Sequence, residues 1–493
     1  MERGDKRFFL SKMRNSSGEA SGDGNRALGE TLLFALSSAL GFVFSLARTK
    51  LQALAWGPVG LGAAGLMQAS MSTASLVCGL GVDGVVTREL AEAGADEKRA
   101  RPVAVAALWG MTVLAIAGGV ASFVVFATMD RLGFPSPAEA LVVAGAVTLS
   151  VVGANLRAIV AGTRQARLLA RSMMISSFAA TALVAVVVAF SNRPLMWAFA
   201  VAAVPLAQFV TLVPAARRSV PFSLASWTRA VPDAIALSRR ASLLAVAGVL
   251  PVLSQLLVRA TARGSLSDQA FGSFQATMAL AATSTSVLAS SVGPSVLPRL
   301  SAVSADKSKL VGVLNDSVGT YLLLFAPIVL TMQSIPELVV RLLYSREFVG
   351  VVDQLPWQMA GEVLRLPSWV MAAALTAQGR YRAYFVVEAI PLVVMVLGVR
   401  LASQSGSLGF VGLAISLANC SQFLVLLLLL QKDEVRMSRP VLLRVAGLVA
   451  LVLAGAWLIP QGHGVRAPIV LAALVAAVLA LRRIRSVRSA SAR

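Results

Sequence analysis

Long apolar runs alternate with short polar connections along almost the whole chain. About fourteen runs reach the roughly 20 residues that a helix needs to cross the hydrocarbon core of a bilayer. The predicted spans are 30–51, 60–83, 103–128, 139–161, 172–191, 195–214, 241–260, 271–293, 313–333, 356–377, 383–401, 408–430, 441–459 and 467–481. Each run is predicted to be a helix, because backbone amides must be paired inside lipid and the short alternating pattern of barrel strands is missing. The pattern therefore predicts an all-α polytopic membrane protein.

The composition agrees with this interpretation and excludes several classes of function. Of the 493 residues, 57% are hydrophobic and only 14% are charged, whereas soluble domains have about 25% charged residues. Two cysteines and one histidine leave no disulfide framework and no Cys/His metal cluster. No Gly-rich phosphate loop with a lysine and no loop with paired carboxylates is found. We therefore expect a membrane protein that is not an enzyme and holds no cofactor.

The basic residues predict the orientation of the chain. The net charge is +21, and 32 of the 44 Lys and Arg residues lie in the two tails and the even-numbered connections. This bias is the positive-inside pattern, which places both termini in the cytoplasm. The charged segment 1–29 reads as a cytoplasmic tail, not as a signal peptide. The excess charge needs only the anionic bilayer surface as a partner, and no nucleic acid.

An internal repeat divides the chain into two halves. The pattern G-x-x-Q-A-[S/T]-M begins at Gly65 in span 2 and again at Gly272 in span 8. Parallel repeats of this kind occur in secondary transporters, so we predict two six-helix lobes around a central cavity. The connection between them carries Phe222 and Trp227 among basic residues, which predicts an amphipathic segment on the inner membrane surface. The predicted divisions are a tail (1–29), an N-lobe (30–214), a basic cytoplasmic linker (215–240), a C-lobe (241–430) and spans 13–14 with a basic cytoplasmic tail (431–493).

Several cations interrupt the apolar runs and are candidates for a substrate site. A cation at the bilayer centre costs about 2.5–3.5 kcal/mol, so such residues usually face a cavity or a partner. Ser45, Arg48 and Gln52 share one helix face. The alternative is that these cations snorkel to the interface. The residues predicted to form a cationic cavity are Arg48, Lys50, Arg157, Arg259, Arg263 and Arg365, and its predicted polar lining is Gln68, Gln275, Gln255 and Asn419.

Two acidic residues inside spans are candidates for ion coupling. Glu362 lies three residues before Arg365, and Glu388 is the other acid well inside a span. A carboxylate that exchanges H⁺ or binds Na⁺ would couple transport to an ion gradient. The alternative is that Glu362 and Arg365 form a structural ion pair on one helix face. Both readings stay open from the sequence.

Two tracts resemble a known family. Residues 57–62 read G-P-V-G-L-G, like the G-P-x-G-x-G entry into the second helix of bacterial polysaccharide flippases. Residues 356–362 read P-W-Q-M-A-G-E, similar to the P-W-Q-hydrophobic-x-G-[D/E] tract of O-antigen and enterobacterial-common-antigen translocases. These are Wzx-type flippases of the multidrug/oligosaccharidyl-lipid/polysaccharide (MOP) exporter superfamily. The resemblance covers about 30–430.

This resemblance implies a function and a set of partners. A Wzx-type flippase carries an undecaprenyl-diphosphate-linked oligosaccharide, such as an O-antigen or exopolysaccharide repeat unit, from the inner to the outer leaflet of the bacterial inner membrane. It works by ion-coupled alternating access, as in an antiporter, and serves lipopolysaccharide or exopolysaccharide synthesis beside a polymerase and chain-length machinery. Arginines in the cavity hold the anionic headgroup. By position and chemistry we expect Arg48, Arg259 and Arg365 in that role.

Three alternatives remain from the sequence. A peptidoglycan lipid-precursor flippase would explain two spans beyond twelve, although the first helix lacks the second-arginine motif expected of that family. A cation-coupled drug exporter of the same superfamily would require acids in its cavity. A membrane enzyme such as a polysaccharide polymerase would need a large outer loop, and the only candidate, 334–355, is short.

Overall fold

The computed structural model describes residues 4–93, 97–129, 132–163, 165–219, 227–289, 296–432, 434–459, 468–476 and 478–479. Phe222 of the predicted linker and the basic C-terminal tail lie outside the described residues. Within the described part there are sixteen α-helices and one π-helix, with no strand. Nine of the described helices are long and apolar enough to cross a membrane. The prediction of an all-α polytopic membrane protein is therefore confirmed.

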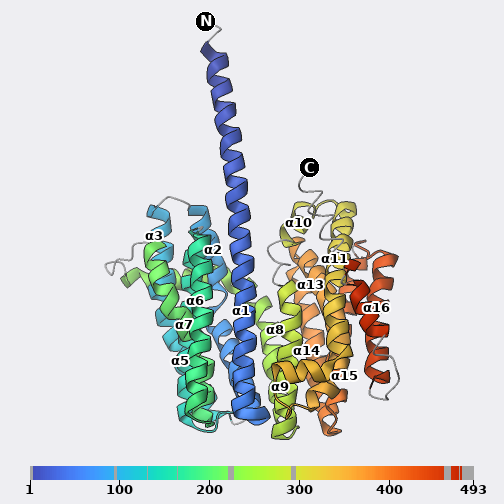
Figure 1. Ribbon diagram of the computed structural model, residues 1–493. Coiled ribbons are helices and arrows are strands. Elements are labelled where there is room, and N and C mark those ends of the chain that lie inside the picture. Colours follow the sequence, from blue (N-terminus) through green and yellow to red (C-terminus); the bar gives the residue numbers. More distant parts are fainter. Residues whose placement is uncertain are drawn as a thin grey trace.

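The helices form two bundles that stand side by side (Figure 1). The first bundle contains α1 (Gly4–Gly79), α2 (Val82–Ala93), α3 (Glu97–Val105), the π-helix η1 (Ala106–Gly110), α4 (Met111–Thr128), α5 (Pro137–Gly162), α6 (Ala166–Phe190) and α7 (Pro194–Ser219). The second contains α8 (Trp227–Arg263), α9 (Asp268–Ala289), α10 (Leu297–Ala302), α11 (Lys307–Ser334), α12 (Pro336–Leu343), α13 (Gly350–Ala377), α14 (Tyr381–Gln404), α15 (Leu408–Lys432) and α16 (Arg439–Leu458).

Helix α1 turns back on itself, so predicted spans 1 and 2 are its two arms. The turn is at Gly57, whose φ of 60° and ψ of −165° are non-helical, and Pro58 follows it. Glycine tolerates a positive φ, and a side chain at this position would also crowd the carboxylate of Glu347. The second arm ends at Leu80 and Gly81, which both have positive φ. In Figure 1 the first arm projects beyond the bundles at the end opposite this turn.

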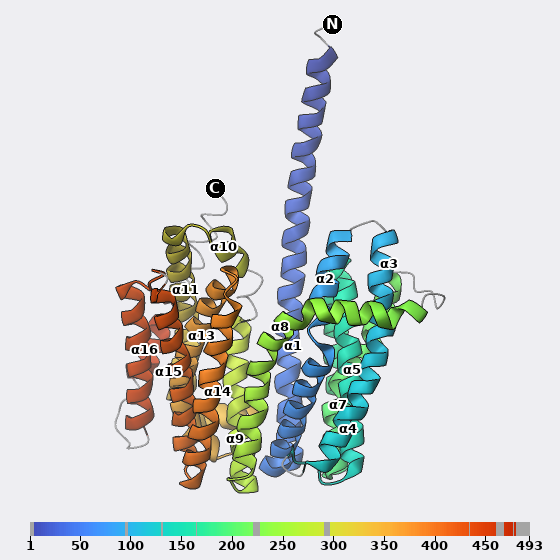
Figure 2. The same ribbon diagram turned by 180° about the vertical axis from the view of Figure 1, so that it is seen from behind.

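The segment that joins the bundles is helical where it is described. Helix α8 first lies across the first bundle and then bends to run alongside α9 (Figure 2). Ala234 and Leu237 are buried in a core shared with α2 and η1, whereas Ile235 on the opposite side is exposed. The predicted linker 215–240 thus contributes the end of α7 and the crossing part of α8.

The two copies of the sequence repeat pack against each other between the bundles. The second arm of α1 contacts α9, which brings Gly65 of the first copy against the side chain of Gln275 in the second. A Cβ atom on Gly272 would overlap the carbonyl group of Pro58. Glycines at these positions therefore permit the close approach of the two helices.

Helix α16 is the longest described element of the region beyond the repeat. It packs on α11 and α13, and the side-chain amide of Gln333 donates to the carbonyl oxygen of Val452. Glu434 lies just before α16 and pairs with Lys307 of α11 at 2.8 Å. The Lys307 ammonium group holds the pKa of Glu434 below its usual range. The region is thus attached to the second bundle.

Candidate functional site: a cationic cavity between the bundles

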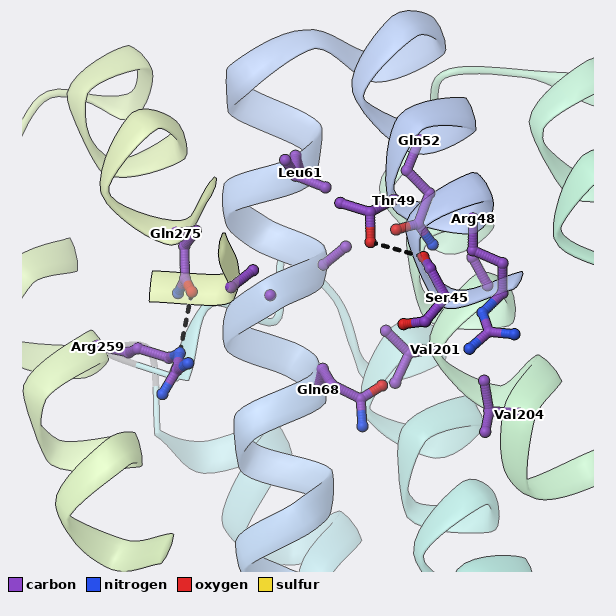
Figure 3. A pocket seen from close by; sticks show the side chains of 14 residues that line it. Ser45, Arg48, Thr49, Gln52, Leu61, Gln68, Val201, Val204, Arg259 and Gln275 are labelled. Atoms are coloured by element: carbon purple, nitrogen blue, oxygen red, sulfur yellow. Dashed lines mark hydrogen bonds between the residues drawn. The ribbon is translucent and has the colours of Figure 1, made fainter. Parts of the chain in front are cut away.

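A polar cavity of about 360 Å³ lies between the two bundles. Both arms of α1 and helix α7 line it from the first bundle, while α8 and α9 line it from the second (Figure 3). The lining residues are Ser45, Arg48, Thr49, Gln52, Leu61, Ala64, Gly65, Gln68, Ala200, Val201, Val204, Arg259, Gln275 and Ala279. The described residues that line this cationic cavity include two arginines and no acidic residue.

Arg259 is held in place by groups of its own bundle. Its Nε atom donates to Oε1 of Gln275 at 2.9 Å. Its Nη1 atom donates to the carbonyl oxygen and to Oε1 of Gln255, at 2.9 and 2.8 Å. All these acceptors are neutral, so they fix the orientation of the guanidinium group without cancelling its charge.

Arg48 is held in the same manner by the other bundle. Its Nη1 atom donates to the carbonyl oxygen of Ser177 at 3.3 Å and to the hydroxyl oxygen of Thr181 at 3.2 Å, both on α6. These acceptors are again neutral. Figure 3 shows Arg48 and Arg259 at opposite sides of the cavity, with Gln68 between them. Each bundle therefore contributes one cation.

The two glutamines of the repeat have different surroundings. Gln275 is 4% exposed, and its Nε2 group has no hydrogen-bond partner among the described residues. The Nε2 group of Gln68 donates to the hydroxyl of Ser72 at 3.2 Å. A buried amide donor without a partner is costly, so the Nε2 group of Gln275 is available for a ligand or water.

Four predicted cavity cations lie elsewhere. The ammonium group of Lys50 donates to the carbonyl oxygen of Leu342 at 2.7 Å. Arg263 pairs with Asp268 and lies over the ring of Phe271. Arg157 interacts electrostatically with Asp83 of α2. Arg365, the fourth, belongs to a separate cluster.

That cluster lies on α13, α14 and α15 and contains both predicted coupling acids. Nη1 of Arg365 is 3.3 Å from Oε1 of Glu362, whose side chain is only 1% exposed. The guanidinium group of Arg365 lies 4.9 Å from the ring centre of Trp369. Glu388 accepts a hydrogen bond of 3.2 Å from Nε2 of Gln422. The positive charge of Arg365 attracts Glu388 and repels Arg259. This interaction links the cluster to the cationic cavity.

Polar atoms without partners remain in this cluster. Oε2 of Glu362 and Nδ2 of Asn419 have no hydrogen-bond partner among the described residues. A Cβ atom on Gly361 would come within 2.9 Å of that Nδ2 atom, so the amide of Asn419 lies against the turn that carries Glu362. Asn419 therefore belongs with this cluster, since it does not line the cationic cavity.

Some lining residues could not have been found from the sequence. Ala200, Val201 and Val204 on α7 are small and apolar, and nothing distinguishes them from residues that face lipid or the core. The sequence gives only a weak indication for Thr49, which is next to Arg48 and the helix face that Arg48 shares with Ser45 and Gln52. Its hydroxyl donates to the carbonyl oxygen of Ser45 at 3.0 Å.

These features define a multi-pass membrane protein with two helix bundles and a cationic cavity between them. Several solved structures are similar to it, among them the following three. The inward-closed lipid II flippase MurJ aligns with a TM-score of 0.69 at 14% identity over 92% of this chain and 98% of its own. An inward-facing multidrug resistance MATE family transporter of the MOP superfamily aligns with a TM-score of 0.62 at 14% identity over 83% and 95%. A MOP superfamily transporter from Pyrococcus furiosus, described by a reversed polarity of its binding pocket, gives 0.54 at 16% identity over 85% and 94%.

The chain therefore has the fold of MOP superfamily transporters. No family model and no curated protein sequence matches it. The fold agrees with the superfamily expected from the two sequence tracts, and it leaves the substrate to be inferred from the cavity.

Proposed function

We propose that this protein is a flippase that moves an undecaprenyl-diphosphate-linked oligosaccharide from the inner to the outer leaflet by alternating access. The observation that carries the proposal is the cationic cavity, where Arg48 and Arg259 face a space without acidic lining residues. A diphosphate cannot cross hydrocarbon unaided, because burying its charge is too costly. Guanidinium groups match phosphate geometry and keep their charge.

The division of the two cations between the bundles suggests how transport proceeds. Among the described residues, the hydrogen-bond partners of Arg48 belong to the first bundle and those of Arg259 to the second. A diphosphate that contacts both favours the state in which the bundles are close. When the bundles rotate apart, each cation moves with its own bundle and the contact to the headgroup weakens. Neutral hydrogen-bond partners hold both cations between transport cycles. Release of the substrate therefore does not leave either guanidinium group without hydrogen bonds.

The cluster on α13, α14 and α15 is proposed to couple transport to H⁺ or Na⁺. Glu362 and Glu388 compensate the charge of Arg365, which in turn acts on Arg259. Neutralising either carboxylate leaves the charge of Arg365 less compensated. The positive potential at Arg259 then rises, so ion binding and binding of an anionic substrate strengthen each other, which corresponds to cotransport and not to the antiport that the resemblance implies. Ion binding and substrate binding are thereby linked through a single arginine.

A peptidoglycan lipid-precursor flippase is the second candidate. The observation that favours it is the similarity to the lipid II flippase, which extends over 92% of this chain against 83% for the MATE transporter. Both candidate substrates share a diphosphate headgroup and a polyprenyl chain, so the cavity suits either one. A drug exporter for cationic compounds is disfavoured, because two uncompensated guanidinium groups repel a cation.

The test is reconstituted transport with two fluorescent lipids. Undecaprenyl-diphosphate oligosaccharide and lipid II, each carrying a reducible fluorophore on the sugar, are placed in liposomes with the protein, and a membrane-impermeant reductant reports leaflet exchange. Arg48→Gln and Arg259→Gln should each slow exchange about tenfold or more, since losing one charge-assisted contact costs roughly 1.5–3 kcal/mol. Arg400→Gln is the matched control, because Arg400 is an exposed residue on α14 outside the cavity.

The outcomes discriminate between the candidates. Faster exchange of the oligosaccharide lipid supports the polysaccharide flippase, and faster exchange of lipid II supports the second candidate. Exchange that is equally fast in Arg48→Gln, Arg259→Gln and Arg400→Gln at equal protein levels would refute a headgroup role for the cavity.

A further inference from the structure

The hydroxyl group of Ser416, on α15, is inserted into the hydrogen-bond ladder of α13. Its Oγ atom donates to the carbonyl oxygen of Trp357 at 2.6 Å and accepts from the backbone amide of Gly361 at 2.9 Å. In a regular α-helix these two backbone groups, four residues apart, pair directly with each other. A side chain that enters the ladder in this way is one of the identifiable causes of a helix kink. We call this position the α13 joint.

Glycines let α15 lie against the backbone of α13 at the joint, and the two helices run side by side (Figure 2). A Cβ atom on Gly361 would be 2.6 Å from the Cα atom of Ser416. A Cβ atom on Gly412 of α15 would be 2.5 Å from the carbonyl oxygen of Gln354. Both distances are shorter than Cβ atoms adopt, so a larger residue at either position would push the helices apart. The close approach brings the hydroxyl of Ser416 within reach of the α13 backbone.

Two prolines weaken the ladder of α13 on either side of the joint. Pro356 and Pro367 both lie inside this helix. Because proline has no N–H, the carbonyl groups four residues earlier, those of Val352 and Val363, lack the donor that a regular helix provides. The middle of α13 is therefore less rigid than an unbroken helix, and it can bend at the joint.

Glu362 is the first residue after the joint, and only one of its carboxylate oxygens has a partner. Its Oε1 atom faces Arg365 at 3.3 Å, whereas Oε2 has no hydrogen-bond partner among the described residues. On α15, Nδ2 of Asn419 likewise lacks a partner there, and it would lie 2.9 Å from a Cβ atom on Gly361. Buried polar groups without partners are costly. A second arrangement of α13, in which Glu362 and Asn419 satisfy each other, is therefore favoured once Glu362 no longer pairs with Arg365.

The charge of Glu362 is balanced mainly by one neighbouring cation. Arg365 pairs with Glu362 and also interacts with Glu388 of α14 and Arg259 of α8. The charged residues of α11 and α16 lie in the first half of each helix. Those of α9 and α15 stand at helix ends, namely Asp268 and Lys432. The neutral titratable residues with described side chains on α11, α14 and α15 are Tyr321, Tyr384 and Cys420. Loss of the charge on Glu362 therefore acts first on Arg365.

We propose that Ser416 is a positioning residue, because its hydroxyl makes the joint at which α13 bends when Glu362 loses its charge. This inference rests on the proposed function and deepens it, since it assigns the moving part of the coupling cluster. Without its charge, Glu362 holds Arg365 less strongly and its free oxygen turns to the amide of Asn419. Arg365 lies on the same side of the joint as Glu362, so it moves with that part of α13. The repulsion between Arg365 and Arg259 then changes, which carries the state of Glu362 to the cationic cavity.

The first experiment measures the bend directly. Spin labels at Val349 and Gln378, which flank α13, report the distance between its ends in lipid nanodiscs. The native cysteines, Cys78 and Cys420, are replaced by alanine so that only the two introduced sites carry labels. We expect Glu362→Gln, which removes the charge at constant pH, to shift this distance. An identical distance with and without Glu362→Gln would overturn the inference.

Ser416→Ala separates the joint from a general effect of the lost charge. It removes the inserted hydroxyl and allows the two backbone groups to pair directly, so the response to Glu362→Gln should disappear. Ser403→Ala is the matched control, because Ser403 is also buried but its hydroxyl donates to the carbonyl oxygen of Val399 on its own helix, α14. Ser403→Ala should keep the wild-type response. Equal responses in Ser416→Ala and Ser403→Ala would contradict a joint at Ser416.

Lipid exchange in liposomes shows whether the joint serves transport. We expect Ser416→Ala to lose several-fold of the stimulation of exchange by a pH gradient or a Na⁺ gradient. Exchange without a gradient and binding of undecaprenyl diphosphate should stay at the wild-type level, because the cationic cavity is intact. A variant that is merely misfolded would lose exchange in both conditions. Equal losses with and without a gradient would therefore speak against a positioning role.

Failure of this inference and failure of the proposed function give different results. If the wild-type protein exchanges lipid under a gradient and Ser416→Ala does so equally well, the inference is wrong and the flippase proposal stands. If the wild-type protein exchanges neither candidate lipid, the proposed function is wrong. The label distances, which require no substrate, then decide by themselves whether α13 bends at Ser416 in response to the charge of Glu362.

Discussion

The ammonium group of Lys50 donates a hydrogen bond of 2.7 Å to the carbonyl oxygen of Leu342. Lys50 is on the first arm of α1, and Leu342 is in the last turn of α12. The last carbonyl groups of a helix lack intrahelical partners and carry partial negative charge, which favours a cation. This bond joins the two bundles close to the turn of α1 at Gly57, so separating the bundles at this end must break it.

We expect Lys50→Met to shift the protein toward the state that is open at this end. A hydrogen bond contributes roughly 0.5–1.5 kcal/mol, so the population ratio should change by about 2- to 12-fold. Spin labels on the α6–α7 turn and the α14–α15 turn would report the distance between the bundles. Arg341→Gln is the control, because it removes one exposed positive charge from α12 without touching the Lys50 bond. An equal shift in both variants would assign the effect to net charge.

Gln275→Glu should abolish the cationic character of one side of the cavity. The Oε1 atom of Gln275 already lies 2.9 Å from Nε of Arg259, so a carboxylate at this position pairs with the guanidinium group and cancels its charge. We expect lipid exchange to fall about tenfold or more, because a charge-assisted contact to the headgroup is worth roughly 1.5–3 kcal/mol. Thermal stability in detergent should be retained, since the new pair also satisfies the cation.

The matched control for that variant is Gln404→Glu. Gln404 is exposed at the end of α14 and does not line the cavity, so it adds the same charge away from the site. Wild-type exchange by Gln275→Glu would show that Arg259 does not bind the headgroup.

The sequence predicted the features that depend on periodicity and on the cost of burying charge. The apolar runs predicted helices, and the fold confirmed them, because lipid allows no other backbone arrangement for such runs. A cation in an apolar run needs a polar environment, which predicts a polar site for Arg48 and Arg259, and the structure places both at one cavity. The conspicuous repeat pointed to Gln68 and Gln275, which line the same cavity.

Other features depend on three-dimensional contacts that no spacing encodes. Lys50 is only two residues from Arg48, yet it bonds to the opposite bundle and not into the cavity, since its direction depends on where α12 ends. Predicted spans 1 and 2 are both helical, but their spacing does not show that the chain reverses between them at a single glycine, Gly57, and not through a loop. The apolar cavity that is lined by Val77, Val125 and Leu257 has no sequence signature, since most of its lining residues are ordinary apolar residues of three helices.

Gly272→Ala should destabilise the contact between α1 and α9. The added Cβ atom overlaps the carbonyl group of Pro58, which is backbone and cannot rotate away. Overpacking of this kind typically costs about 1–3 kcal/mol, so we expect a lower thermal midpoint in detergent. Gly447→Ala on α16 is the control, because nothing lies within 4 Å of its added Cβ atom. There alanine should raise stability by about 0.5–1 kcal/mol through its better helix propensity. If the two variants behave alike, the close approach at Gly272 is not a constraint on the fold.

A double-mutant cycle on Glu362 and Arg365 separates a structural ion pair from ion coupling. Glu362→Gln leaves Arg365 without its carboxylate partner, and we expect a loss of about 1–3 kcal/mol, because the side chain of Arg365 is still 24% exposed and partly solvated. Adding Arg365→Met removes the unpaired cation, so the double variant should regain most of that stability, with an interaction energy of about 0.5–3 kcal/mol. Thermal unfolding in detergent measures both effects.

Glu362→Gln, Arg365→Met and their double variant, compared with Glu388→Gln, test the coupling proposal in liposomes under a pH gradient or a Na⁺ gradient. If Glu362 exchanges the coupling ion, Glu362→Gln should make lipid exchange independent of the gradient, even at a temperature where the variant is fully folded. If exchange in Glu362→Gln still follows the gradient and only Glu388→Gln loses that dependence, Glu362 serves the structural pair and Glu388 carries the coupling. Gradient dependence that survives in every variant would place the coupling site outside this cluster, because both of its acids would then have been neutralised without effect.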